Sequence, residues 1–413
     1  MSTQASPVRR RHVFFIGGFD PRGAAPHYAT YQREAGRAAS VEGQTVHVSA
    51  RKRTSDGTSL WQVTSSGRDL PDDSACMTDY EFLAWDAIVR RHWPRGPVRL
   101  ITDLLHAYYQ YGRTSAPRAG YRLVPRPVFL MFLLPALVLL VTLTGSGLLG
   151  AVAVWMTLAL GAGKVLAGVT GAAVATALMA AAWALERQLE TGWISRILAF
   201  TDRVARGRVP EMDQWIDNMA ALVARRMNQG DADEVLLVGH SVGSILCVSV
   251  AARALRLHSQ YLAGVSAISP TADASLPQGR PPVLSLLSLG HCIPLLGLLP
   301  SAQEFRRELV ELANRTDVAW LDFSSPGDWG SFALINPVAA CAPQPFTGLW
   351  PLMRSPRFHT LFTPEEYAPL QRNKRRLHMQ YLQAGTRQGD YSYFAITGGS
   401  MTLTGRYAPT VST

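Results

Sequence analysis

The chain has 413 residues, of which 47% are hydrophobic and 17% charged, and this length allows one large globular domain with a further segment. Its four cysteines, Cys76, Cys247, Cys292 and Cys341, are widely scattered, which argues against a disulfide framework or a zinc site and fits a reducing compartment. The net charge of +10 is compatible with nucleic-acid binding. However, the basic residues gather beside a long apolar segment, so we expect them to contact anionic lipids and expect no nucleic-acid partner.

Short strands dominate the expected structure of the first part of the chain. Residues 12–23 begin as an apolar strand and break at a Gly-Gly pair. Residues 45–51 and 59–65 alternate like the two strands of a hairpin, and residues 80–92 predict a helix. The basic N-terminus is followed by an apolar run too short for the core of a signal peptide, so no cleavable signal is expected.

A membrane hairpin is predicted in the middle of the chain. From 128 to 185 the only charged residue is Lys164, and about 20 apolar residues are enough to cross a bilayer. We expect two helices, near 128–150 and 164–186, joined by a Gly-rich turn. Two buried core helices are the alternative, but soluble cores rarely run this long without charge. Small residues on the second helix favour close packing within the hairpin, or between copies in a homo-oligomer. These residues are Gly168, Gly171, Ala172, Ala175 and Ala180.

Arginines flank the predicted hairpin on both sides. Those before it are Arg113, Arg118, Arg122 and Arg126, and those after it are Arg187, Arg196, Arg203, Arg206 and Arg208. Under the positive-inside rule both flanks stay in the cytoplasm. We therefore expect a two-helix protein of the inner (cytoplasmic) membrane with both termini on the cytoplasmic side.

Strands and helices alternate beyond the hairpin. Strands are expected at 235–238, 283–290 and the start of 317–328, and helices at 212–227, 244–255 and 302–315. This alternation predicts an α/β fold with a mainly parallel, doubly wound sheet. The expected organisation is one domain in two parts, residues 1–127 and 187–413, interrupted by the hairpin at 128–186.

The motif Gly239-His240-Ser241-Val242-Gly243 lies between a strand and a helix. A turn tight enough to hold Ser241 at its apex leaves no room for side chains two positions before and after it, and glycines occupy both positions. The serine hydroxyl is a weak nucleophile alone and needs a neighbouring imidazole to remove its proton. His240 is not expected to be that base, because adjacent residues on such a turn point apart.

The strand, the Gly-His-Ser-Val-Gly turn and the helix resemble the α/β-hydrolase fold, and most of the chain outside 128–186 is similar to it. The resemblance is closest to membrane-associated bacterial lipase and esterase-like proteins, and it implies a serine nucleophile, an acid and a histidine in that chain order. The acid would follow a later strand, which favours Asp328, after the strand Val-Ala-Trp-Leu-Asp-Phe, over Asp322 within it.

Two histidines follow Asp328 and could be the base. His359 lies on an expected loop before a helix-start signal, Thr363-Pro364-Glu365-Glu366. His378 falls within a helical pattern, but its His-x-x-Tyr spacing is similar to the catalytic histidine segment of some lipase-like relatives. The resemblance favours His378, whereas loop position alone favours His359.

Two backbone N–H groups are expected to stabilise the charge that develops on the substrate oxygen. By the resemblance, Val242 supplies one and Phe19 the other, although Gly17 stands where the family usually has a histidine. We expect a membrane-anchored hydrolase of carboxylic esters, with a lipid or lipophilic ester as substrate and no metal or organic cofactor. An acyltransferase with the same triad, and an inactive hydrolase-fold scaffold, are the alternatives.

Overall fold

The computed structural model describes residues 7–67, 75–93, 96–189, 192–268, 282–342 and 348–407. The chain divides into two compact units. The sheet unit consists of Met1–Arg91 and Val204–Thr413, and the helical unit is His92–Arg203. The helical unit thus contains the apolar segment together with shorter helices on both sides of it.

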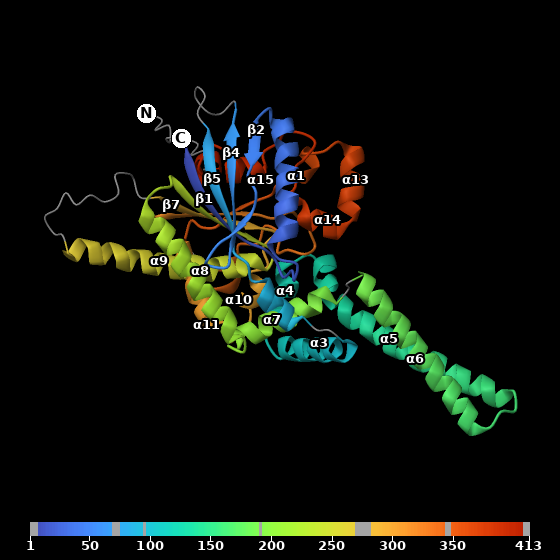
Figure 1. The fold of residues 1–413 in the computed structure, drawn as a ribbon. Coiled ribbons are helices and arrows are strands. Elements are labelled where there is room, and N and C mark those ends of the chain that lie inside the picture. Colours follow the sequence, from blue (N-terminus) through green and yellow to red (C-terminus); the bar gives the residue numbers. More distant parts are fainter. Residues whose placement is uncertain are drawn as a thin grey trace. The chain divides into compact units, whose positions relative to one another are not determined.

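The sheet unit is built on a nine-stranded sheet with the order β2-β4-β5-β1-β6-β7-β8-β9, in which β3 pairs with β4 (Figure 1). The strands are β1 Arg10–Ile16, β2 Thr45–Val48, β3 Lys52–Arg53, β4 Ser59–Ser66, β5 Cys76–Phe82, β6 Glu234–His240, β7 Val283–Leu289, β8 Val318–Phe323 and β9 Leu352–Arg354. From β5 to β9 every neighbouring pair is parallel, whereas β2, β3 and β4 pair antiparallel. The prediction of an α/β fold with a mainly parallel sheet is confirmed.

Helices cover both faces of the sheet. On β1, Phe15 stacks on His27 of α1 (Ala24–Glu42), with ring centroids 4.1 Å apart. The next residue, Ile16, pairs with Gly239, where a Cβ would lie 2.8 Å from Cβ of Cys247 on α9 (Gly243–Ile268). Because successive side chains of a strand point to opposite faces, α1 and α9 lie on opposite sides of the sheet.

The remaining helices of the sheet unit pack around this framework. Helices α8 (Pro210–Gln229) and α11 (Gln303–Ala313) pack against α9, and α15 (Tyr393–Gly398) lies beside α1. The others are α2 Asp86–His92, α10 Pro294–Gly297, α12 Pro337–Cys341, α13 Pro364–Arg372, α14 Lys374–Met379 and α16 Leu403–Tyr407, with short 3₁₀ turns η1 Phe358–Thr360 and η2 Gln380–Leu382.

The prediction of a helix at 80–92 is wrong for its first half. Residues 76–82 form β5, and the helix α2 begins only at Asp86. Along β5, Thr78, Tyr80 and Phe82 are buried, and the strand is paired on both sides, with β1 and β4. This pairing across distant parts of the chain outweighs a local pattern that suits a helix.

Long apolar helices form most of the helical unit. Its helices are α3 Pro97–Gly112, α4 Ala116–Leu123, α5 Arg126–Ala159, α6 Lys164–Leu189 and α7 Trp193–Ala205. Within α5 and α6, residues 132–159 and 164–186 are long and apolar enough to cross a membrane. The first helix runs past its expected end near 150, because the glycines after Thr144 stay helical, as glycine often does in apolar helices.

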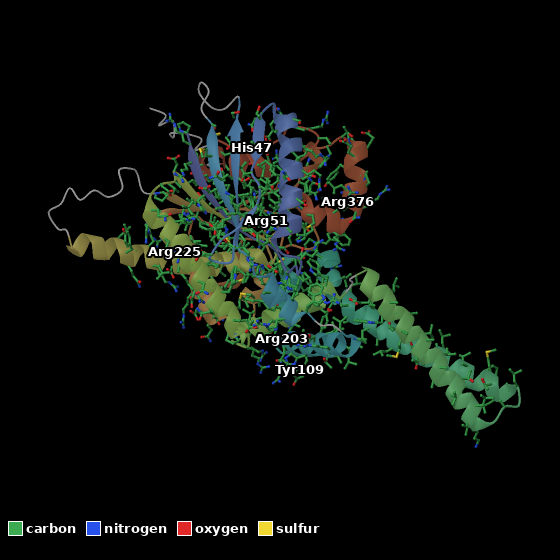
Figure 2. The ribbon with its side chains drawn as sticks, viewed as in Figure 1. His47, Arg51, Tyr109, Arg203, Arg225 and Arg376 are labelled. Atoms are coloured by element: carbon green, nitrogen blue, oxygen red, sulfur yellow. The ribbon has the colours of Figure 1, made fainter. Side chains whose placement is uncertain are left out.

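Helices α5 and α6 pack closely as an antiparallel hairpin (Figure 1). A Cβ on Gly171 would overlap the Val154 side chain and lie 2.8 Å from the carbonyl oxygen of Gly150. The small residues of α6 are therefore used, at least in part, for contact within the hairpin. Elsewhere in the helical unit, Arg203 of α7 forms an ion pair with Asp103 of α3; Figure 2 labels Arg203 and, on α3, Tyr109.

Candidate functional site

The turn between β6 and α9 holds Ser241 in a strained conformation. Its φ angle is +56°, which few residues other than glycine adopt. A Cβ on Gly239 would lie 2.6 Å from Cα of Ser244, and one on Gly243 would overlap the carbonyl oxygen of Ile16. Both glycines are thus required by close backbone approach, and together they allow β6 to turn sharply into α9 with Ser241 at the apex.

The loop after β1 passes directly beside this serine. A Cβ on Gly18 would lie 3.2 Å from Cβ of Ser241 and 3.6 Å from its Oγ. Phe19 follows, buried, with its ring centroid 5.9 Å from that of Trp85. Val242 directly precedes α9, where the first N–H groups of a helix lack intrahelical acceptors. The two residues expected to donate to a substrate oxygen therefore lie in the segments that flank Ser241.

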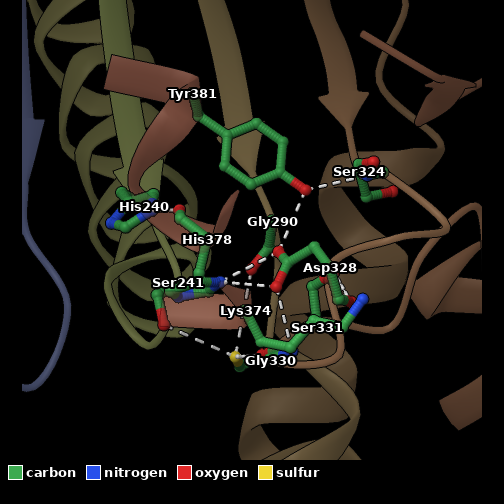
Figure 3. Close-up of polar contacts among 12 residues, drawn as sticks. His240, Ser241, Gly290, Ser324, Asp328, Gly330, Ser331, Lys374, His378 and Tyr381 are labelled. Carbon is green, nitrogen blue, oxygen red and sulfur yellow. Dashed lines mark hydrogen bonds and ion pairs between the residues drawn. The ribbon is translucent and has the colours of Figure 1, made fainter. Parts of the chain in front are cut away.

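His378 and Asp328 form a buried pair near this turn (Figure 3). His378 Nδ1 lies 3.0 Å from Oδ1 and 2.9 Å from Oδ2 of Asp328, and the two side chains are 9% and 0% exposed. An ionised carboxylate can only accept hydrogen bonds, so Nδ1 carries the proton. In the neutral imidazole, Nε2 is then the basic nitrogen. In the view of Figure 3, the His378 ring lies between Ser241 and Asp328.

Further donors hold the Asp328 carboxylate in place. The N–H of Gly330 donates to Oδ1 at 2.9 Å, and the hydroxyl of Tyr381 donates to Oδ2 at 3.0 Å. Burial alone would raise the pKa of Asp328, but His378 and these donors outweigh it and leave the pKa below its usual value. The carboxylate is therefore ionised at neutral pH.

The partner imidazole shows the opposite shift. Burial alone would lower the pKa of His378, but the charge of Asp328 and the hydrogen bond to it raise the pKa above its ordinary value. The pair is therefore arranged to stabilise a protonated imidazole, which is the form that a general base adopts after it has taken a proton.

His240 anchors the segment that carries His378. Its Nε2 lies 3.0 Å from the backbone oxygen of His378, and the two rings are 5.0 Å apart between centroids. Because a carbonyl oxygen only accepts, this Nε2 is the donor. Burial, followed by the charge of His378, lowers the pKa of His240 to about 3, so it stays neutral. Because His240 directly precedes Ser241, this hydrogen bond connects the turn to α14.

Cys292 also borders Ser241. Its Sγ lies 3.7 Å from Ser241 Oγ and 3.3 Å from the carbonyl oxygen of Gly330, to which it donates. Burial raises the pKa of this thiol to about 12. It is therefore a neutral neighbour of Ser241 and a poor nucleophile.

Two of the sequence-based candidates lie apart from this group. His359 is exposed on η1, where its ring lies 6.2 Å from that of Tyr367. Asp322 is fully buried at the end of β8 and accepts hydrogen bonds from Ser288 at 2.8 Å and Ser324 at 2.6 Å. The structure brings His378 and Asp328 together and does not pair His359 or Asp322 with either of them.

Sequence reasoning missed the role of Tyr381. Its hydroxyl accepts from the N–H of Ser325 at 2.8 Å while it donates to Asp328. Gly290, with φ +53°, makes room for the ring, since a Cβ there would lie 2.7 Å from it. The His-x-x-Tyr spacing of His378 and Tyr381 was the available signal, because it places both residues on one short turn-rich segment.

Residues 289–300, an apolar stretch after β7, are mostly buried and contain the short helix α10. Ser241 is itself 2% exposed. Across the part of the chain that the structure describes, His, Cys, Asp and Glu form no group that could hold a metal ion.

Comparisons with protein-family models, with curated proteins and with solved structures found no match.

Proposed function

We propose that this chain is a membrane-anchored serine hydrolase of the α/β-hydrolase type that cleaves carboxylic esters of lipids or phospholipids. The nucleophile is Ser241, the base is His378 and the acid is Asp328. The observation that carries the proposal is the buried His378–Asp328 pair beside a serine held at φ +56°. A buried ion pair with a purely structural role would not need a strained serine beside it, and a strained turn would not need a buried ion pair. The combination of the two features therefore supports a catalytic site.

The order of the chain gives further support. The serine follows β6, the acid follows β8 and the histidine follows β9. The carboxyl ends of parallel strands lie at one edge of a sheet, which is where open α/β sheets bind ligands. Each of these residues thus belongs to a segment at the same edge, in the order serine, acid, histidine.

The proposed reaction has two halves. Ser241 Oγ attacks the ester carbonyl carbon while His378 Nε2 takes the hydroxyl proton, and Asp328 stabilises the resulting imidazolium. The bond to the alcohol then breaks, and His378 returns the proton to the leaving oxygen. Water adds to the acyl-enzyme by the same steps, which release the carboxylic acid and restore Ser241.

Backbone donors would stabilise the oxygen on which charge develops. We assign this role to the N–H groups of Val242 and Phe19 because their segments flank Ser241. Removing one such donor costs about 10²–10³ in rate in a serine protease. At these positions the donors belong to the backbone, so the sheet and α9 hold them in place without side-chain ordering.

The helical unit suggests the substrate. We propose that α5 and α6 cross the inner membrane with both flanks in the cytoplasm, since arginines lie on both sides of the hairpin. A hydrolase attached to the membrane in this way meets lipids far more often than soluble esters. Acyl esters of lipids or phospholipids are therefore the proposed substrate class.

The test is hydrolysis in reconstituted vesicles. Purified wild-type protein and Ser241→Ala are incubated with a phospholipid and a diacylglycerol labelled in the acyl chain, and released fatty acid is measured. Wild type should release acid and Ser241→Ala should not. Transfer of label to an added alcohol or amine, without release of acid, would instead indicate an acyltransferase. No turnover of either kind by folded wild type would favour a scaffold.

A further inference from the structure

One face of α3 exposes a stripe of apolar side chains. Val98 is 74% exposed, and Leu105 and Tyr109 are each 58% exposed. Their spacing places them on one side of the helix. Leu100, Leu104 and Ala107 are buried on the other side. The helix therefore packs within its unit through one face and presents a second apolar face, which we call the α3 stripe.

This helix is joined to the start of the apolar span. The hydroxyl of Tyr108 on α3 donates to the backbone oxygen of Phe132 in α5. Phe132 is also the first residue of the segment long and apolar enough to cross a membrane. If α5 crosses a bilayer, this hydrogen bond holds α3 at the level where the hydrocarbon region begins.

Charge around the stripe has one dominant sign. Residues 97–126 contain five arginines, Arg99, Arg113, Arg118, Arg122 and Arg126, against one acid, Asp103, which is paired with Arg203. At the end of the stripe, Arg113 lies over the Tyr109 ring at 5.2 Å and donates to its hydroxyl at 2.9 Å. Aromatic rings with a cationic neighbour beside an apolar surface are typical of the boundary between lipid tails and headgroups.

We propose that α3 is an interfacial helix, which inserts the α3 stripe into the anionic leaflet at the base of the hairpin while the surrounding arginines bind lipid phosphates. The inference rests on the proposed membrane insertion of α5 and α6, and it does not depend on the catalytic proposal. A bilayer is the occupant favoured by the continuity with α5 and by the excess of arginine.

Site-directed fluorescence in vesicles tests the inference. The four native cysteines are buried, so an added surface cysteine can be labelled selectively with an environment-sensitive fluorophore, and unsubstituted protein gives the background. Leu105→Cys reports on α3. Leu257→Cys, an exposed leucine on α9, is the matched control in the sheet unit, and Leu140→Cys reports on the hairpin. Full-length protein is reconstituted in phosphatidylcholine vesicles with or without phosphatidylglycerol.

Interfacial helices lie roughly 5–10 Å into the headgroup boundary, so lipids with a nitroxide at a shallow depth should quench the label at position 105. Iodide in the water should quench this label about threefold less than the label at position 257. Omitting phosphatidylglycerol should reduce the lipid quenching of Leu105 about twofold and leave Leu140 unchanged, because the arginines need anionic headgroups.

Three results would overturn the inference. Equal iodide access at Leu105 and Leu257, with Leu140 embedded, would place α3 in water. Protection of Leu105 from iodide without quenching by nitroxide lipids would mean that protein, either this chain or a second copy, covers the stripe. A water-exposed Leu140 would reject the hairpin and α3 proposals together, while ester hydrolysis would still test the catalytic proposal independently.

Discussion

Tyr381 donates its hydroxyl proton to Asp328 Oδ2 at 3.0 Å, on the same carboxylate that receives His378 Nδ1. A hydrogen bond to a charged group contributes about 1.5–3 kcal/mol. Tyr381→Phe should therefore lower kcat about tenfold or more, with little change in KM, since each 1.36 kcal/mol of barrier is a factor of ten in rate.

The matched control is Tyr407→Phe, which removes a hydroxyl that donates to Asp390 O at 2.9 Å. Steady-state kinetics and thermal unfolding of both variants separate a positioning role from a loss of stability. Equal effects of the two substitutions on kcat would contradict the assignment of Tyr381 to the site.

The rate should depend on pH through His378. Only the neutral imidazole can take the proton of Ser241, so kcat/KM should rise as pH increases through the pKa of His378. Burial opposes the charged imidazole, but Asp328 raises that pKa above its ordinary value. In Asp328→Asn the midpoint should move to lower pH, and the rate should fall by on the order of 10⁴, because Nδ1 no longer has its charged acceptor. A pH profile with an unchanged midpoint would contradict this pairing.

Gly243, the second residue after Ser241, should tolerate no side chain. At Gly243 an added Cβ would overlap the carbonyl oxygen of Ile16, so Gly243→Ala must displace α9 or β1. We expect a loss of more than about 3 kcal/mol of folding free energy, together with activity. Gly36→Ala, at an open position within α1, should instead be neutral or stabilise by about 0.4–1 kcal/mol. Denaturant unfolding of both variants measures the contrast, and similar values would refute the steric argument.

A related contrast applies to the hairpin. A Cβ on Gly171 would collide with Val154, whereas one on Gly168 meets nothing within 4 Å. Gly171→Ala should therefore separate α5 from α6 and lower the midpoint of thermal unfolding in lipid nanodiscs, and Gly168→Ala should not. If Gly168→Ala alone were harmful, its face would instead contact another chain, as in the homo-oligomer that the small residues also allow.

Local signals made much of this arrangement predictable from the sequence. The turn at Ser241 was recognisable because a strand, two glycines at fixed offsets and a helix leave few other geometries. The hairpin was recognisable because an uncharged apolar run of that length has few stable environments. The helix beginning at Pro364 was also expected, and the structure confirms its capping box between Thr363 and Glu366.

The remaining features depend on contacts between distant parts of the chain. His378 and Asp328 are 50 positions apart, and the His-x-x-Tyr spacing favours His378 over His359 without indicating its contact with Asp328. The same holds for β5, whose identity as a strand comes from pairing with β1 and β4. Tyr381 was missed because its ring fits only where Gly290, which follows a different strand, lacks a side chain.

The central claim is that His378 activates Ser241. Membranes containing the wild type or the Ser241→Ala, His378→Ala or His359→Ala variant would be labelled with a fluorophosphonate probe and compared at equal amounts of folded protein. We predict labelling of the wild type and His359→Ala and none of the other two. Labelling that survives in His378→Ala but is lost in His359→Ala, or an unlabelled folded wild type, would contradict the claim.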